Sequence, residues 1–318
     1  MKPSISAAVL IVIMSVATGF VDLRTRAYPE RAYTEFIPRV VDGSADAPER
    51  YRVLVPFSVH AFARSTGLTP ASAWHLTRLA LFVAAYVVVF RYLRTWFGEP
   101  QALLGTALVA ATLPLTFTNS WAHPDHPAEL VLFTAGCHAV ATGRTGWLAV
   151  ILALATLNRE TAIFLVPLYL VAGSVDRRRA LVTIGLGLEW AAIYLGLRAW
   201  RGFVHYDYLQ ISRNLDFLGL LPANYDPYYR AYGYFGILLF GGMLFAAFRA
   251  WRPGAPDFAT RALLIVPLVA AVAFTISSVI ETRIFTLLYP LVLPAVIFAS
   301  AGADTRSKTL RDPLIRTP

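Results

Sequence analysis

The chain has 318 residues, of which 57% are hydrophobic and only 15% are charged, and its mean hydropathy is +0.57. Soluble globular domains have about a quarter of their residues charged, so this composition excludes an ordinary soluble domain. The formal net charge of +9 does not call for nucleic acid as a partner, because basic residues retained at an anionic membrane surface account for it.

Apolar windows recur along nearly the whole sequence. They fall at 5–21, 73–92, 101–117, 128–142, 146–157, 161–173, 181–199, 233–249, 262–280 and 284–300. We therefore predict an all-α protein, a polytopic transmembrane helical bundle with about ten hydrophobic segments, the first of them an uncleaved span. Residues 1–300 are expected to form one integral membrane domain and residues 301–318 a cytoplasmic basic tail.

The basic run Asp176-Arg177-Arg178-Arg179 fixes the expected orientation, because arginines in short connections stay in the cytoplasm. Counting spans from this turn places both termini in the cytoplasm. The same count places the polar connections on the opposite, extracytoplasmic face. These connections are residues 22–72, 118–127, 158–160, 200–232 and 281–283.

The first of these loops is long, carries both acids and arginines, and begins where the first span ends. Asp22 lies at that boundary, where partial desolvation can adjust a carboxyl group for general-base catalysis; a solvated helix end is the alternative. Glu35 is a second candidate base. The stretch from Tyr51 to Arg64, which includes Arg52, alternates polar and apolar residues as an interfacial helix does, and simple anchoring is the other interpretation.

The second polar loop contains His123, Asp125 and His126 within four residues. Imidazole nitrogens and a carboxylate can bind a divalent cation such as Mg²⁺ or Mn²⁺, with Asp125 as the candidate metal ligand. A loop in which Asp125 only caps the next helix is the alternative. Glu129 follows in the next apolar window and is expected to face the same cavity, because exposure to lipid is costly.

The string Asn158-Arg159-Glu160-Thr161 interrupts two short apolar windows. Asn158 is available to cap the helix that begins near Glu160. Arg159 and Glu160 are expensive inside a membrane unless they are paired, so they are interpreted either as ligand-binding residues or as a structural ion pair. A helix break at charged residues indicates a cavity, because protein or water must cover the broken ends.

Two further stretches carry candidate substrate-binding residues. Tyr206 and Tyr208 lie in a tyrosine-rich segment where rings next to carboxylates can stack on a sugar, although an aromatic belt at the membrane surface is the alternative. Glu281-Thr282-Arg283 separates the last two windows. Arg283 can reach a phosphate through its forked donors, or it can pair locally with Glu281.

These features together resemble the GT-C superfamily of membrane glycosyltransferases, and the strings Arg52-Val53-Leu54-Val55-Pro56 and Asn158-Arg159-Glu160-Thr161 look like those of small bacterial members. The resemblance implies a polyprenyl-phosphate-linked sugar as donor and a glycan, lipid or protein as acceptor, at the cytoplasmic (inner) membrane of a bacterium. It also implies that the general base is Asp22, or Glu35 in its place, and that Asp125 holds a metal or the acceptor. The candidate substrate-binding residues are Arg52, His123, Asp125, His126, Arg159, Glu160, Tyr206, Tyr208, Glu281 and Arg283.

The resulting hypothesis is a sugar transfer on the extracytoplasmic face. A transporter or flippase of a lipid-linked envelope precursor is the first alternative, and it is expected to show a midplane site and internal repeats, which the sequence does not display. A non-catalytic envelope-assembly protein is the second alternative, in which substitutions at the candidate residues would be silent.

Overall fold

The computed structural model describes residues 3–25, 30–116, 126–205, 209–218, 227–249, 255–277 and 282–300. Regular structure within these ranges is helical throughout and includes no strand, which confirms the all-α prediction for the described part of the chain. The α-helices are α1 (Ile5–Thr25), α2 (Ile37–Asp42), α3 (Leu54–Thr66), α4 (Pro70–Leu93), α5 (Glu99–Thr112), α6 (His126–Ala141), α7 (Thr145–Asn158), α8 (Leu165–Val171), α9 (Arg177–Arg201), α10 (Ile211–Phe217), α11 (Pro227–Arg249), α12 (Asp257–Ala262), α13 (Val266–Ile276) and α14 (Leu288–Ser300). The π-helix η1 (Ala32–Phe36) and the 3₁₀ segments η2 (Glu49–Tyr51), η3 (Leu113–Thr116), η4 (Glu160–Phe164), η5 (Leu263–Ile265) and η6 (Thr282–Leu287) join or extend them.

Four helical stretches in the described part are long and apolar enough to cross a membrane: Ile5–Arg24, Pro70–Leu93, Arg177–Arg201 and Asp257–Ile276. The prediction of about ten such segments is therefore wrong in number. Apolar helices at Thr145–Asn158, Glu160–Val171, Gly233–Arg249 and Phe285–Ser300 are shorter.

Helix interruptions explain the difference between apolar windows and membrane-length helices. A helix of 14 residues such as α7 rises only about 21 Å, against a hydrocarbon thickness of about 30 Å. The helix stops at Asn158 because Arg159 takes an extended conformation, with φ −164° and ψ 141°. The sequence predicted a helix break at these residues, and the structure confirms it.

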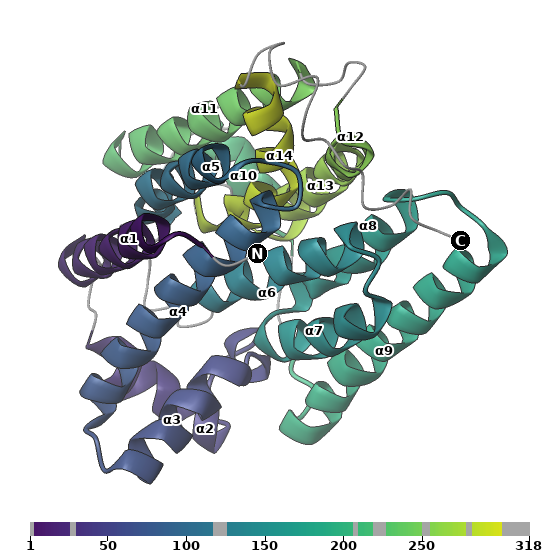
Figure 1. Ribbon diagram of the computed structural model, residues 1–318. Helices are drawn as coiled ribbons and strands as arrows, with labels where there is room; N and C mark the ends of the chain where they lie inside the picture. Colours follow the sequence, from purple (N-terminus) through teal and green to yellow (C-terminus); the bar gives the residue numbers. More distant parts are fainter. Residues whose placement is uncertain are drawn as a thin grey trace.

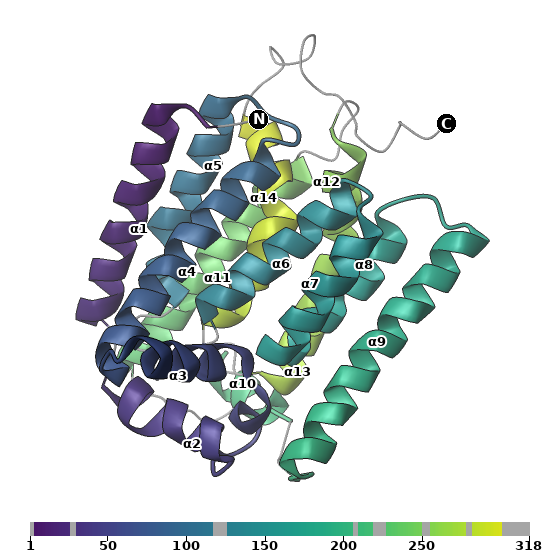
Figure 2. The same cartoon turned by 60° about the horizontal axis from the view of Figure 1, so that its bottom comes forward.

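The helices form a bundle with two different ends (Figures 1 and 2). At one end α2, α3 and α10 lie across the bundle, and we call it the polar end. At the other end α1 begins and α14 ends, and we call it the basic end because Arg94 follows α4, Arg144 precedes α7 and Arg177 starts α9 there. The predicted outer connections that the structure describes thus meet at one end, as the loop count required.

Close contact between α6 and α8 fixes the position of the break after α7. A Cβ added to Gly136 of α6 would lie 2.6 Å from Cδ1 of Leu165, the first residue of α8, so any larger residue at 136 would require the Leu165 side chain to move. Leu165 is fully buried and the chain from Glu160 onward therefore lies directly on α6. This packing brings residues 159–161 beside the first turn of α6.

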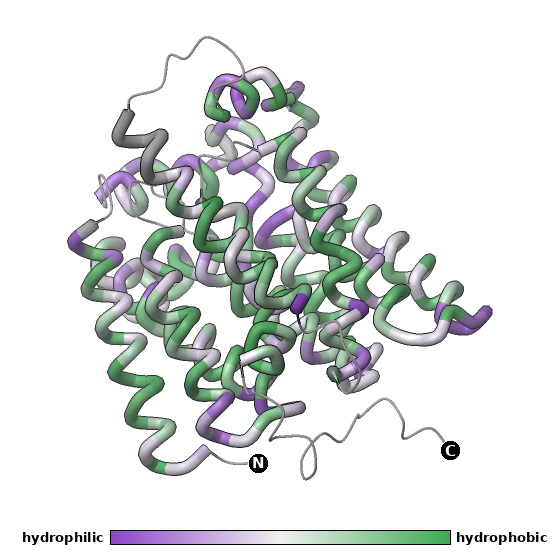
Figure 3. Tube along the Cα trace, turned by 90° about the horizontal axis from the view of Figure 1, so that it is seen from above, coloured by the Kyte–Doolittle hydropathy of each residue, from purple (hydrophilic) through white to green (hydrophobic). Residues whose placement is uncertain are grey.

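The outward surface of α9 is largely apolar and uncovered. Only 11% of its apolar window is buried inside the molecule, compared with 44% for α4. Figure 3 shows hydrophobic residues along the long helices at the edge of the bundle. An uncovered apolar surface of this kind is compatible with contact with lipid.

Candidate functional site

Charged and strongly polar side chains are buried at the polar end. Each of the following is less than a tenth exposed: Asp22, Arg52, Arg78, His126, Glu129, Asn158 and Arg159. Acids and arginines are almost never buried unless they are paired. Their pairings therefore define the candidate site.

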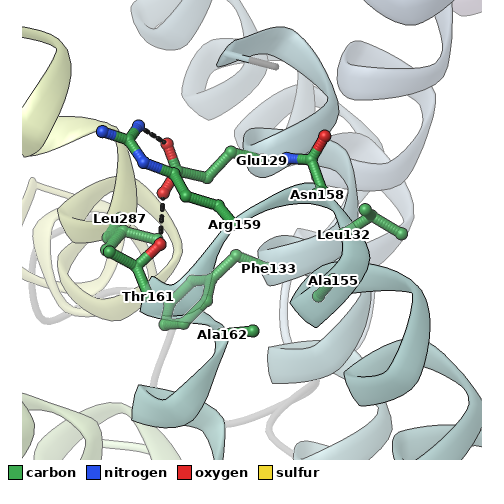
Figure 4. Close-up of a pocket in the computed structure, with 9 residues that line it drawn as sticks. All are labelled: Glu129, Leu132, Phe133, Ala155, Asn158, Arg159, Thr161, Ala162 and Leu287. Atoms are coloured by element: carbon green, nitrogen blue, oxygen red, sulfur yellow. Dashed lines mark hydrogen bonds and ion pairs between the residues drawn. The ribbon is translucent and has the colours of Figure 1, made fainter. Parts of the chain in front are cut away.

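Glu129 is at the centre of the tightest cluster (Figure 4). Arg159 donates from Nη1 to its Oε2 at 2.6 Å, and the Thr161 hydroxyl donates to its Oε1 at 2.6 Å. Both carboxylate oxygens thus accept a short hydrogen bond, one of them charge-assisted. The sequence predicted Arg159 as paired or ligand-binding and Glu129 as facing the cavity, but it assigned no role to Thr161.

The break between α7 and η4 presents two opposite faces. Arg159 and Thr161 both reach Glu129, whereas Glu160 between them is turned toward Arg52, whose Nη2 donates to Oε1 at 2.9 Å. Trp190 of α9 donates to the Glu160 carbonyl at 3.2 Å. Arg159 is extended, whereas Glu160 and Thr161 begin the 3₁₀ segment η4, and the change of conformation between them accompanies the two-sided arrangement.

The predicted capping role of Asn158 is wrong. The residue at the N-cap of η4 is Arg159, and no side-chain hydrogen bond caps this segment. Asn158 is instead the last residue of α7 and is buried among the residues that line the pocket in Figure 4.

Two adjoining hollows share Glu129, Arg159, Thr161 and Leu287. The first extends toward α7, where Phe133, Ala155 and Asn158 line it. The second is lined by Phe164 of η4 and by one apolar face of α13: Val269, Val272, Ala273 and Ile276. A buried ion pair therefore stands directly beside an apolar wall.

His126 begins α6 next to this cluster. Its Nε2 lies 2.9 Å from the Thr286 hydroxyl of η6, and its Nδ1 is 4.0 Å from Oε2 of Glu129. His123 and Asp125, the other proposed metal ligands, lie outside the described residues. Within the described ranges no three His, Cys, Asp or Glu residues come together as a metal site. The cation site thus stays a prediction that depends on the loop before His126.

Asp22 forms a second buried pair, with Arg78 of α4. The guanidinium donates from Nε to Oδ2 at 2.5 Å and from Nη2 to Oδ1 at 2.8 Å, and it lies over the rings of Trp74 and Phe82. Both carboxylate oxygens of Asp22 thus accept a charge-assisted hydrogen bond from Arg78. The structure places the predicted base in a link between α1 and α4, and it gives a partner to Arg78, which the sequence left unassigned.

The remaining candidates lie apart from this cluster or outside the described structure. Glu35 is exposed on η1, 3.7 Å from Arg31. Tyr206, Tyr208 and Glu281 fall outside the described residues, and Arg283 is described only for its backbone in η6. Their roles stay predictions.

The loop that carries Arg52 is fastened to α9. The Tyr51 hydroxyl donates to the Gly202 carbonyl at 2.8 Å, and the Arg198 guanidinium lies 4.3 Å from the Tyr51 ring centre. Arg52 therefore contacts Glu160 from a loop that the neighbouring residue Tyr51 attaches to the end of α9. The predicted helix after it is present as α3, which lies across the polar end (Figure 2).

Comparisons of the chain with protein-family models, with curated proteins and with solved structures found no match.

Proposed function

We propose that the protein is a membrane glycosyltransferase that moves a sugar from a polyprenyl-phosphate donor to an acceptor at the polar end of the bundle. The observation that supports this proposal is the joining of the Glu129–Arg159 pair to the apolar wall of α13 in one pocket. A lipid phosphate has the same two parts, an anionic group and a hydrocarbon chain.

The fit of such a donor follows from the chemistry of the lining. Arg159 offers a planar fork of donors that suits phosphate oxygens. Val269, Val272 and Ile276 offer the surface that a hydrocarbon chain needs, because burying apolar area is favourable by roughly 25 cal/mol per Å². When the bond to the sugar breaks, negative charge grows on the leaving phosphate, and a fixed cation beside it stabilises the transition state.

The bundle is proposed to lie in the bacterial cytoplasmic membrane with the basic end inside. In this placement the four membrane-length helices span the hydrocarbon layer of the membrane. The shorter apolar helices lie alongside them, and neighbouring protein covers their ends. Arginines in the turns of the basic end favour the cytoplasm. The polar end, with its pocket, then faces the extracytoplasmic side, where a glycan, lipid or protein acceptor can approach.

Transfer of label from polyprenyl-phosphate sugars by purified protein in liposomes tests the proposal. A panel of radiolabelled donors is supplied with candidate glycan, lipid and protein acceptors, and we expect label to move covalently to an acceptor. Movement of intact donor between leaflets without cleavage would favour the flippase alternative. If no donor were either cleaved or moved between leaflets, the proposal would be contradicted.

A further inference from the structure

We infer that Glu129 is the proton acceptor of the transfer and that the donor's phosphate activates it by taking Arg159 away from it. This inference rests on the proposed function. It assigns a catalytic role to a residue that the sequence placed only as lining the cavity, and it makes Arg159 a group that changes partner during the reaction.

The substrate-free geometry explains why an exchange is needed. Arg159 and Thr161 donate to the two oxygens of Glu129 at 2.6 Å each, so donors already occupy both oxygens where an acceptor hydroxyl would have to approach. A second anion in the pocket competes for the same guanidinium. Phosphate has more acceptor oxygens than a carboxylate and binds arginine bidentately, so it can draw Arg159 from Glu129.

Position distinguishes Glu129 from Asp22, Glu35 and Glu160, the other candidate acids that the structure describes at the polar end. Glu129 lines both hollows, whereas Asp22, Glu35 and Glu160 line neither. Asp22 is gripped at both oxygens by Arg78, and Glu160 is turned toward Arg52. The carboxylate that meets both the cation and the apolar wall is therefore the one that a bound lipid phosphate would expose.

The step balances without any added reagent. The acceptor hydroxyl oxygen forms a bond to the anomeric carbon as its proton passes to the freed oxygen of Glu129. The bond from the anomeric carbon to the phosphate oxygen breaks, and its electron pair leaves with the lipid phosphate, which Arg159 holds. Departure of the lipid phosphate returns Arg159 to Glu129, and the proton goes to water.

Thr161 is a positioning residue in this scheme. Its hydroxyl stays on Oε1 of Glu129 while Oε2 changes partner, so the carboxylate keeps its orientation. Thr161→Val removes that hydrogen bond and keeps the side-chain volume. We expect transfer to fall about tenfold with lipid-phosphate binding unchanged, since a misdirected base loses only part of its effect.

Two measurements on the full chain test the exchange: equilibrium binding of radiolabelled, sugar-free polyprenyl phosphate, and sugar transfer. For Glu129→Gln we expect binding at least as tight as in the wild type, because the Glu129 carboxylate no longer competes with the phosphate for Arg159. Sugar transfer by Glu129→Gln should fall at least about 100-fold, the usual range for loss of a general base. Arg159→Gln should weaken binding about tenfold or more. Glu189→Gln on α9, which lines neither hollow, is the matched control and should leave both unchanged.

A purely structural ion pair predicts a different pattern. Glu129→Gln would then lose binding and transfer together, and that result would overturn the inference. Normal transfer by Glu129→Gln, or by a folded Thr161→Val protein, would also overturn it while leaving the proposed function in place. Absence of transfer by the wild type from every donor would remove the proposed function and the base together.

Discussion

Arginine has opposite surroundings at the two ends of the bundle. At the polar end Arg52, Arg78 and Arg159 are buried and each meets a carboxylate at 2.9 Å or less. At the basic end Arg91, Arg144 and Arg178 are exposed. In the proposed function the same side chain serves two purposes: exposed arginines orient the bundle in the membrane, and buried ones build the site.

Burial decides which arginines matter for chemistry. An exposed charge is solvated and screened, and its removal changes little. A buried charge has given up its hydration, so its partner and its position are fixed at considerable cost. Substitutions at the two ends are therefore expected to differ sharply in effect.

The largest difference expected is in accessibility. With the buried Cys137 replaced by Ser, single cysteines at Asp42 and Arg178, both exposed, are treated with an impermeant thiol reagent on intact cells. Position 42 should label and position 178 should label only after the membrane is opened. Labelling of position 178 from outside would reverse the orientation of the two ends.

Next in size is the loss of stability when a buried pair is broken. Arg78→Leu leaves Asp22 buried without its cation and should cost about 3–5 kcal/mol, measured as unfolding in detergent. Arg144→Leu at the basic end should cost less than about 0.5 kcal/mol. The double variant Asp22→Leu with Arg78→Leu should regain part of the lost stability. An equal loss of stability for Arg78→Leu and Arg144→Leu would contradict the difference proposed between buried and exposed arginines.

A smaller effect is expected at the partly hydrated pair. Arg52→Gln leaves Glu160, whose side chain is 26% exposed, with water as a substitute partner, so unfolding should be easier by about 1–3 kcal/mol. A double-mutant cycle with Glu160→Gln isolates the coupling between them. A coupling near zero would mean that the Arg52 loop does not hold the break in place.

The smallest effect is expected on the surface of the polar end itself. Arg39 and Asp46 are 2.9 Å apart, yet their side chains are 48% and 84% exposed. Asp46→Asn should change stability by less than about 0.5 kcal/mol, and high salt should remove even that difference. A loss comparable to that of Arg78→Leu would show that position in the bundle, rather than burial, sets the cost.

Hydropathy and charge predicted the helical class, the helix after Arg52 and the gathering of the described polar connections at one end. They also predicted the helix break at residues 158–160, but not every helix length, because the 3₁₀ segments η3, η5 and η6 overlap apolar windows that read as continuous. They placed Glu129 in the cavity and predicted Arg159 as either paired or ligand-binding. The partners Thr161 and Arg78 were missed because they depend on how helices distant in sequence pack, for which a single sequence contains no signal.

Sugar transfer by Arg159→Gln, measured beside Arg144→Gln in the same liposomes, tests the central claim most directly. Both substitutions remove one arginine near an end of α7, one buried and one exposed. The account predicts that Arg159→Gln loses most of the transfer and that Arg144→Gln retains it. Equal activity of the two variants would contradict the assignment of the pocket at the polar end as the active site.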